Sequence, residues 1–355
     1  MNGIGQGTHA AGKGMRRQHR FSALSRRRRL FFLLIFAAVV VVLLAGAYLA
    51  GRWYENKGYT DERQRMSENF GKLHTVAYQG QTYLRRPEVS TLLIMGVDQR
   101  DGSEITGYRS GGQADFLMLL AIDSANRQVH QLQVDRDAIT EVPIVGVLGN
   151  QVGTRQMQIC LAHAYGGSEE ERSRHTVQAL ANLLGGETAG HVISVRLDGI
   201  GRLNSLLGGV TVTVPADYSQ LDPAMTKGAV LTLNDAQAEL LVRSRMTIEG
   251  GTNAERMVRQ RSFMNAVIQK IRGNVKENAD FAGTLFDILD EISDYTDLQR
   301  GEMINEVTQA LTYDILPVET LTGEYTIGSD GFVEFHADED AVAAWVLQTL
   351  YEPKK

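Results

Sequence analysis

A long uncharged segment near the N-terminus most limits what this chain can fold into. Residues 30–50, LFFLLIFAAVVVVLLAGAYLA, contain no charged side chain. At about 1.5 Å per residue, a helix of this length covers roughly the 30 Å hydrocarbon core of a bilayer. A cleaved signal peptide is the alternative, but its apolar region usually has only about 7–15 residues. We therefore predict a retained transmembrane helix at residues 30–50.

The charges before this segment predict its orientation. Residues 1–29 carry several basic residues, among them the run Arg26 to Arg29, and no acidic residue. Because positively charged flanks stay in the cytoplasm, residues 1–29 are expected to form a cytoplasmic basic tail. The protein is then expected in the cell membrane as a single-pass protein, with a cytoplasmic N-terminus and an extracytoplasmic C-terminal domain.

The charge of the remaining chain excludes one class of partner. Residues 1–52 hold nine of the 36 Lys and Arg residues and none of the 42 Asp and Glu residues. Residues 53–355 therefore carry 36 − 9 = 27 basic against 42 acidic groups, a net charge of −15. Such a domain is not expected to bind nucleic acid through a general basic surface. An anionic ligand would need a local basic pocket.

After the membrane segment, strand and helix patterns alternate. Residues 51–88 are predicted to form a stalk and a small hairpin that turns at Gln79-Gly80. Strands are predicted at 90–95, 115–122, 128–134, 191–197 and 210–214, with short ones near Tyr325 and Phe332. Helices are predicted at 173–184, 235–243, 253–272, 279–294, 298–313 and 338–351, and a short helix that ends at Leu207 is predicted after the strand at 191–197. This alternation indicates an α/β fold.

Acidic residues stand at the ends of the first predicted strands. Asp98 follows the strand at 90–95, and Asp115 begins the next strand after a glycine-rich loop. In open α/β sheets, ligands gather beyond the carboxyl ends of the strands. If these two strands are antiparallel, Asp98 and Asp115 meet, and two carboxylates beside phosphate oxygens suit Mg²⁺. Taken alone, each aspartate is more often a turn residue or a cap.

Arginines without a single lysine gather between Leu240 and Arg261. They are Arg243, Arg245, Arg256, Arg259 and Arg261. A guanidinium group binds two oxygens of one phosphate and stays charged at any biological pH, so the pattern indicates oriented binding of a phosphate. A solvated basic helix face is the alternative.

The predicted helix at 253–272 divides its side chains between two faces. Arg256, Arg259 and Gln260 share one face near the helix start, where free backbone amides also favour an anion. The opposite face is expected to be the buried one, and it carries Met257, Met264, Ile268 and Ile271. The first turn and its arginines are therefore predicted to face the same anionic ligand.

Two reactive residue types stand in apolar surroundings. His163, in the segment LAHAYGG, is a candidate general base, but a single histidine in such a context is more often a hydrogen-bonded core residue. Cys160 is the single cysteine and is expected to be a buried thiol. No cysteine and histidine spacing suggests zinc.

The order of these motifs resembles the LytR-CpsA-Psr family of membrane-anchored cell-wall glycopolymer phosphotransferases. LLIMGVD and QADFLML resemble the family's two aspartate segments, and Asp135-Arg136-Asp137 resembles its Pro-Arg-Asp motif. LAHAYGG, LLGGVTVTVP, LNDAQAELLVRSR and RMVRQR follow in the expected order. No single motif is specific, but the ordered series behind a basic head and one membrane span is distinctive.

The resemblance implies a three-layer α/β/α domain with a central mixed sheet, behind one N-terminal transmembrane helix. Residues 89–320 would form the catalytic domain, and residues 321–355 the strands and helix that complete it. The implied partners are a polyprenyl-pyrophosphate-linked glycan, a peptidoglycan acceptor and the membrane, with Mg²⁺ as cofactor. The glycosyl phosphate would pass from the carrier to a peptidoglycan hydroxyl.

The resemblance also implies roles for individual residues. The catalytic residues would be Asp98, Arg136, Arg245 and Arg256. The substrate-binding residues would be Arg109, Gln113, Arg243, Arg259 and Gln260, and Asp98 and Asp115 would hold the metal.

Three positions depart from the family pattern. Gln113 stands where the family usually has an arginine, whose place Arg109 could take. Asp135 replaces a proline, and Asn253 stands where the family often has an aspartate. A non-catalytic receptor or scaffold for lipid-linked or cell-wall glycans is therefore the alternative function. A regulator acting through the basic head is less favoured, because that head has no folded DNA-binding pattern.

Overall fold

The computed structural model describes residues 75–98, 111–244, 253–278, 281–299 and 310–354. The chain divides into two units, residues 1–51 and 52–355, and all described residues belong to the second. The predicted cytoplasmic tail, the predicted transmembrane helix at 30–50 and the stalk up to residue 74 lie outside the described residues. Within the described ranges, no helix has the length and apolar character needed to cross a bilayer.

A six-stranded mixed sheet forms the centre of the domain, in the order β11-β8-β3-β4-β5-β12. Its strands are β3 (Val89–Asp98), β4 (Gln113–Asp123), β5 (Gln128–Val134), β8 (His191–Arg196), β11 (Ser293–Thr296) and β12 (Asp314–Thr320). β3 runs parallel to β8 and antiparallel to β4, and β5 runs antiparallel to β4 and parallel to β12. The prediction of an α/β fold with a central mixed sheet is therefore confirmed.

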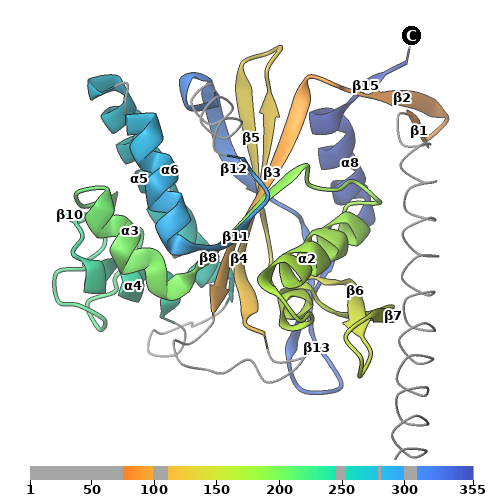
Figure 1. The fold of residues 1–355 in the computed structure, drawn as a ribbon, viewed down its shortest axis with the longest axis horizontal. Helices are drawn as coiled ribbons and strands as arrows, with labels where there is room; N and C mark the ends of the chain where they lie inside the picture. The colour runs from red at the N-terminus through yellow and green to blue at the C-terminus, as the bar shows by residue number, and fades with distance from the viewer. Residues whose placement is uncertain (1–74, 99–110, 245–252, 279–280, 300–309, 355) are drawn as a thin grey trace, which may run out of the picture. The chain divides into compact units, whose positions relative to one another are not determined.

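Helices cover both faces of this sheet (Figure 1). One face carries α2 (Glu169–Leu183) and α8 (Glu339–Leu350), and the other carries α3 (Ile200–Leu206), α4 (Asp235–Arg243), α5 (Asn253–Glu277) and α6 (Phe281–Ile292). Successive strand residues point to opposite faces. Leu93 accordingly packs in the core that contains Leu180 and Trp345, whereas Leu92 packs in the core that contains Leu241 and Phe263. The continuous apolar run of β3 thus supplies two cores at once.

Smaller strand pairs surround the central sheet. β1 (Thr75–Tyr78) and β2 (Gln81–Arg85) form the predicted hairpin, and β15 (Tyr351–Pro353) pairs with β2. Three further antiparallel pairs are β6 (Ile139–Val145) with β7 (Gln151–Gln158), β9 (Thr211–Thr213) with β10 (Val230–Thr232), and β13 (Gly323–Ile327) with β14 (Val333–Ala337). Short 3-10 helices, η1 (Ile159–Ala164) and η2 (Leu197–Gly199), connect neighbouring elements.

The structure adds strands that the sequence pattern did not predict. β7 reads QVGTRQMQ and is exposed along much of its length, so it lacks an apolar pattern and depends on pairing with β6. β11 and β12 form the two edges of the central sheet and are short or only partly buried. The predicted helix at 298–313 falls largely outside the described residues, and α5 extends to Glu277, beyond the predicted end at 272.

Replacement of Leu93 by alanine tests the core. Leu93 lies in the middle of β3 and is 0% exposed. We expect Leu93→Ala to lower the free energy of unfolding by about 2–5 kcal/mol, because the surrounding side chains close such a cavity only in part. Equilibrium chemical denaturation measures this change. Val230→Ala, at a position 69% exposed, is the control, and an equally small loss in both variants would contradict the packing described here.

Candidate active site

The ends of β3 and β4 bring the two predicted metal-binding aspartates together. The strands are antiparallel, and Asp98 pairs with Gln113. The register shifts between Gly96 and Val97, so that Asp115 is the extra residue of a bulge. A bulge redirects the side chain that it carries. A Cβ atom at Gly96 would lie 2.8 Å from Leu197 Cδ2 and 3.0 Å from Phe116 Cβ, so a larger residue here would require these side chains to shift.

Asp115 is buried, at 4% exposure, and two arginines hold its carboxylate. Arg136, which follows β5, forms an ion pair with Oδ1. Arg256, in the first turn of α5, lies with its Nη1 atom 3.3 Å from Oδ2. Gln260, one turn further along α5, donates a hydrogen bond of 3.4 Å to the Asp115 carbonyl oxygen. Three residues predicted for the site therefore converge on Asp115.

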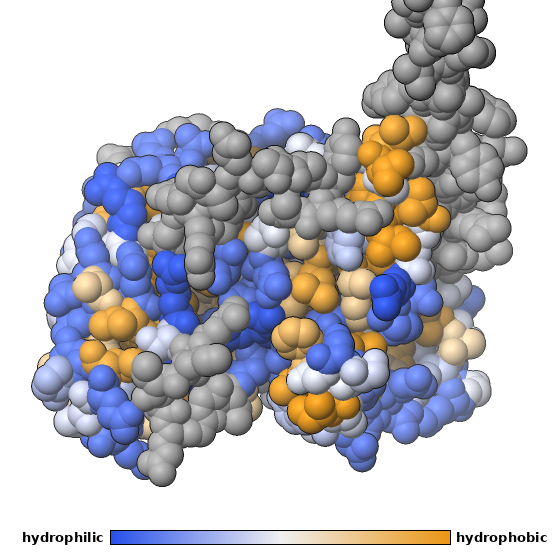
Figure 2. All heavy atoms as spheres, turned by 90° about the horizontal axis from the view of Figure 1, so that it is seen from below, coloured by the Kyte–Doolittle hydropathy of each residue, from blue (hydrophilic) through white to orange (hydrophobic). Residues whose placement is uncertain are grey.

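Asp98 is more accessible, and within the described part of the chain it forms an ion pair with Arg243. Nη2 of Arg243, at the C-terminal end of α4, donates to Asp98 Oδ1 at 3.2 Å. The two side chains are about one-third exposed, at 34% and 35%. Hydrophilic side chains fill the centre of the face at which β3 ends (Figure 2). Arg109 and Arg245, also predicted for the site, lie outside the described residues.

A polar network fixes the Arg136 side chain. Its Nη2 donates to Gln113 Oε1 at 2.8 Å, and its Nε donates to Asp137 Oδ1 at 3.2 Å. Burial alone would lower the pKa of Arg136, but the neighbouring Cys160, Asp115 and Asp137 raise it. Gln113, predicted to bind substrate, thus accepts a hydrogen bond from a predicted catalytic arginine.

Arg259 points away from the aspartates. Its side chain is 1% exposed, and its Nε donates to the Leu241 carbonyl oxygen at 3.1 Å. Its Nη2 donates to the Ser244 carbonyl oxygen, and its guanidinium carbon lies 5.3 Å from the centre of the Tyr218 ring. These contacts fix the C-terminal end of α4, from which the Arg243 side chain extends to Asp98.

The two faces of α5 differ from the prediction. Arg256, Arg259 and Gln260 are all buried, at 5%, 1% and 3% exposure, because the first turns of α5 pack between α4 and the sheet. The expectation that the opposite face is the buried one was correct for Met257. It was wrong for the remaining three residues, which are only partly buried and border a cavity. These are Met264, Ile268 and Ile271.

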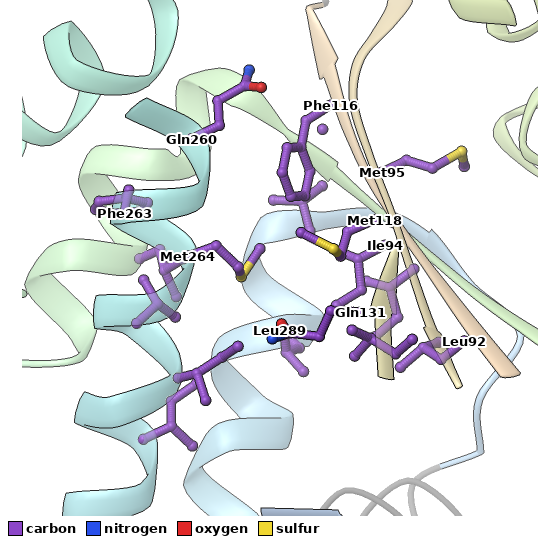
Figure 3. A pocket seen from close by; sticks show the side chains of 18 of the residues that line it. Leu92, Ile94, Met95, Phe116, Met118, Gln131, Gln260, Phe263, Met264 and Leu289 are labelled. Carbon is purple, nitrogen blue, oxygen red and sulfur yellow. The ribbon is translucent and has the colours of Figure 1, made fainter. Parts of the chain in front are cut away.

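That cavity, of about 200 Å³, lies between the sheet and helices α5 and α6. Gln260 and Phe116 lie at one end, next to Asp115, and Leu92 lies at the other (Figure 3). From Gly96 to Leu92, β3 alone spans roughly 13 Å at about 3.3 Å per residue. The lining is almost entirely apolar, apart from Gln131 and Gln260. A polar, arginine-rich site therefore adjoins an elongated apolar cavity.

A chain of hydrogen bonds continues from Arg256 away from Asp115. Nη2 of Arg256 donates to Asn253 Oδ1 at 2.6 Å, and Nδ2 of Asn253 donates to Asp135 Oδ1 at 2.6 Å. The hydroxyl of Tyr325 donates to Asp135 Oδ2 at 2.5 Å. Two departures from the family pattern, Asp135 and Asn253, are thus in direct contact. Sequence reasoning missed Tyr325, because nothing in its local sequence connects it to a residue so far away along the chain.

His163 and Cys160 are core residues. His163 is 0% exposed, and burial, together with the charge of Arg172, lowers its pKa to about 3. Such a histidine stays neutral and out of contact with solvent, which agrees with the core interpretation and not with a general base. Cys160 is 1% exposed, and burial raises the pKa of its thiol to about 12.

The two aspartates have the donor chemistry that Mg²⁺ uses. Among the described residues, no three His, Cys, Asp or Glu side chains gather into a preformed cation site. Mg²⁺ is commonly held by one or two carboxylates together with water and substrate phosphates, so the pair Asp98 and Asp115 fits this ion. The arginines that now neutralise both carboxylates are themselves suited to phosphate oxygens.

Comparison with known proteins assigns the chain to a family. Residues 54–349 match the model of the LytR_cpsA_psr family. The chain therefore belongs to this family of α/β proteins, as its motifs had indicated.

One relative and two solved structures illustrate the likeness. TagU of Halalkalibacterium halodurans, named a polyisoprenyl-teichoic acid–peptidoglycan teichoic acid transferase, is 30% identical over 218 residues, which cover 60% of this chain and 62% of that protein. The chain thus spans less than two thirds of that relative's length.

The crystal structure of gbs0355 from Streptococcus agalactiae has a TM-score of 0.59 and 20% identity, covering 74% of this chain and 86% of that one. A structure described as TagT bound to LI-WTA has a TM-score of 0.56 and 19% identity, covering 74% and 91%. The two structures show a shared fold.

The buried neutral His163 predicts how stability depends on pH. Its pKa is about 3 in the folded protein and about 6.5 in an unfolded chain, so the unfolded state binds the extra proton between these values. The free energy of unfolding should therefore fall as pH falls from about 6.5 towards 3, by up to about 1.4 kcal/mol per pH unit from this group. Chemical denaturation at several pH values measures the slope.

His163→Gln should reduce this slope, because the glutamine does not titrate. His336→Gln is the control, since the side chain of His336 is 48% exposed, and it should keep the wild-type slope. An unchanged slope in His163→Gln would assign the acid sensitivity to other groups.

Proposed function

We propose that this protein is a glycopolymer phosphotransferase, which moves a glycopolymer from a polyprenyl-pyrophosphate carrier to peptidoglycan at the outer face of the membrane. The observation that carries the proposal is the position of Arg136, Arg243 and Arg256. They meet Asp98 and Asp115 at one end of an apolar cavity. A lipid pyrophosphate has the same division into an anionic head and an apolar tail. The name of the TagU relative supports teichoic acid as one class of glycopolymer.

The donor would bind partly in the arginine site and partly in the apolar cavity. Its pyrophosphate would lie against the three arginines, and the first part of its polyprenyl tail would enter the cavity past Phe116 and Gln260. In this structure each of these arginines is paired with an aspartate, and Arg136 is paired with Asp137 as well as Asp115. When the pyrophosphate binds, the arginines would exchange their carboxylate partners for phosphate oxygens. Arg259 would act indirectly, through its bonds to the end of α4.

The reaction would be a phosphoryl transfer. The oxygen of an acceptor hydroxyl attacks the phosphorus that carries the glycan, and the bond from this phosphorus to the bridging oxygen breaks. The polyprenyl phosphate leaves with the electron pair, and the hydroxyl proton passes to water or to the leaving phosphate. Arg136, Arg243 and Arg256 would neutralise the charge that grows on the phosphate oxygens, which is a main source of rate in such reactions.

Mg²⁺ and the membrane anchor complete the proposal. Asp98 and Asp115 would hold Mg²⁺. When bound, the ion would neutralise phosphate oxygens and stabilise the leaving group. Residues 30–50 would keep the domain at the outer membrane surface, where a lipid-linked donor is found. Arg245, which follows the described end of α4, would join the arginines around the pyrophosphate.

The alternative function is a non-catalytic receptor or scaffold for lipid-linked or cell-wall glycans. It is favoured by Gln113, which accepts a hydrogen bond from Arg136 where the family usually has another arginine. Incubation of the protein with a polyprenyl-pyrophosphate glycan and Mg²⁺ separates the two functions. An enzyme releases polyprenyl phosphate, whereas a receptor binds the donor without releasing it.

Replacement of Asp98 tests the catalytic proposal. We expect Asp98→Ala to lower the rate of polyprenyl phosphate release by roughly 10²–10³-fold, because the variant loses one proposed ligand of the Mg²⁺ that would stabilise the transition-state charge. The fold should survive, because Asp98 is partly exposed. The control is Glu170→Ala, which removes a similar arginine-paired carboxylate whose side chain is 50% exposed on α2. A wild-type rate in Asp98→Ala would remove this residue from the mechanism, and Arg245→Ala is interpreted in the same way.

Narrowing of the cavity tests the binding of the polyprenyl tail. Met264 lines the cavity from α5, so Met264→Trp should fill part of it. We expect kcat/KM to fall at least tenfold for a long-chain donor and to change little for a donor with a very short chain. The short-chain donor is the internal control for folding and chemistry. An equal loss with both donors would show that the tail does not occupy this cavity.

A further inference from the structure

A second cavity, of about 120 Å³, lies at the far end of the hydrogen-bond chain that starts at Arg256. It is formed by the end of β5, the first turns of α5, the end of β12 and the hairpin β13–β14. Its principal lining residues are Gln133, Asp135, Met257, Arg261, Tyr325 and Phe335. It shares no lining residue with the apolar cavity beside Phe116. The two cavities therefore suit different parts of a ligand or different ligands.

The second cavity combines polar groups with aromatic rings. Asp135 supplies a carboxylate, Arg261 a guanidinium, and Gln133 an amide whose oxygen accepts from Arg261 Nη1 at 2.9 Å. The rings of Tyr325 and Phe335 lie 4.9 Å apart, at 46° to each other. The negative charge of Asp135 and the positive charge of Arg261 cancel, so the lining has no net charge. The cavity therefore favours a neutral ligand that has both apolar faces and hydroxyl groups.

Its size narrows the ligand class further. One buried water needs roughly 10–15 Å³ of accessible cavity volume, so a volume of 120 Å³ has room for several waters or one small ring. A sugar ring presents apolar C–H faces to aromatic side chains and hydroxyl groups to carboxylates, amides and guanidinium groups. The polar side chains are already held in place, since Asp135 accepts from both Asn253 and Tyr325. Such preorganisation lowers the cost of ordering side chains on binding.

We propose that this cavity binds one neutral sugar ring of a glycan, and that Asp135 and Tyr325 position it. The assignment of that glycan to the peptidoglycan acceptor rests on the proposed function. Asp135 is joined through Asn253 to Arg256, which holds Asp115. A sugar bound beside Asp135 is therefore connected by direct contacts to the residues proposed to hold the donor.

Binding of a neutral disaccharide of N-acetylglucosamine to the full-length protein in detergent or lipid nanodiscs tests the site. We expect saturable binding to the wild type, measured by ligand-observed NMR. Tyr325→Phe keeps the ring but loses the hydrogen bond to Asp135, and Asp135→Asn keeps the shape but loses the charge. Each should raise the dissociation constant roughly tenfold, the usual effect of losing a hydrogen bond to a charged group.

Tyr78→Phe is the matched control. The hydroxyl of Tyr78 donates to Asp340 Oδ1 at 2.8 Å, so this variant also removes a phenol–carboxylate bond, but away from the cavity. It should bind the disaccharide like the wild type. Wild-type affinity in both Tyr325→Phe and Asp135→Asn, or no binding by the wild type, would overturn the proposal.

A second arm identifies the source of the sugar. The same titration is repeated with the protein saturated by a short-chain polyprenyl-pyrophosphate disaccharide. Retained binding supports an acceptor glycan, whereas competition supports the sugar site but assigns it to the donor. Release of polyprenyl phosphate is measured in parallel. A wild type that binds the disaccharide without cleaving the donor contradicts the proposed function alone, and one that cleaves the donor without binding the disaccharide contradicts the sugar site alone.

Discussion

The buried carboxylate of Asp115 is the constraint on which the site depends. A charge at 4% exposure is stable only with partners of opposite charge, and Asp115 has Arg136 and Arg256 as partners. These arginines belong to elements far apart in sequence, the end of β5 and the start of α5. The need to neutralise one carboxylate therefore joins three elements at the same end of the sheet. Arg243 and Asp98 form a second, more accessible pair beside it.

The central strands determine where the polar site meets the apolar cavity. Alternate residues of β3 serve opposite cores, and the side chains on the α5 and α6 side leave a cavity along the sheet. The bulge at Gly96 and Asp115 ends this regular alternation and turns a carboxylate towards the arginines. Phe116, which lines the cavity, pairs with Gly96, and Asp98 follows Gly96 by two residues on β3. The surroundings thus change from apolar to charged within two residues of one strand. This closeness allows one ligand to contact both.

Much of this arrangement could be predicted from sequence, and the remainder has identifiable reasons. The apolar runs of β3 and β4 predicted their strands, and helical spacing correctly placed Arg256 and Gln260 together near the start of α5. The same spacing also grouped Arg259 with them, but a long side chain can turn along the helix, and Arg259 reaches the carbonyl groups at the end of α4. β7 escaped prediction because its polar sequence has no strand periodicity. Tyr325 meets Asp135 across 190 positions of sequence, a contact that local patterns do not contain.

The bulge between β3 and β4 has a consequence for how such a protein can diversify. The two carboxylates are positioned by strand pairing and by the extra residue in β4, and not by the residues that connect the strands. A diversifying protein of this kind can therefore keep the carboxylate pair only if it keeps this strand register and the extra residue in β4.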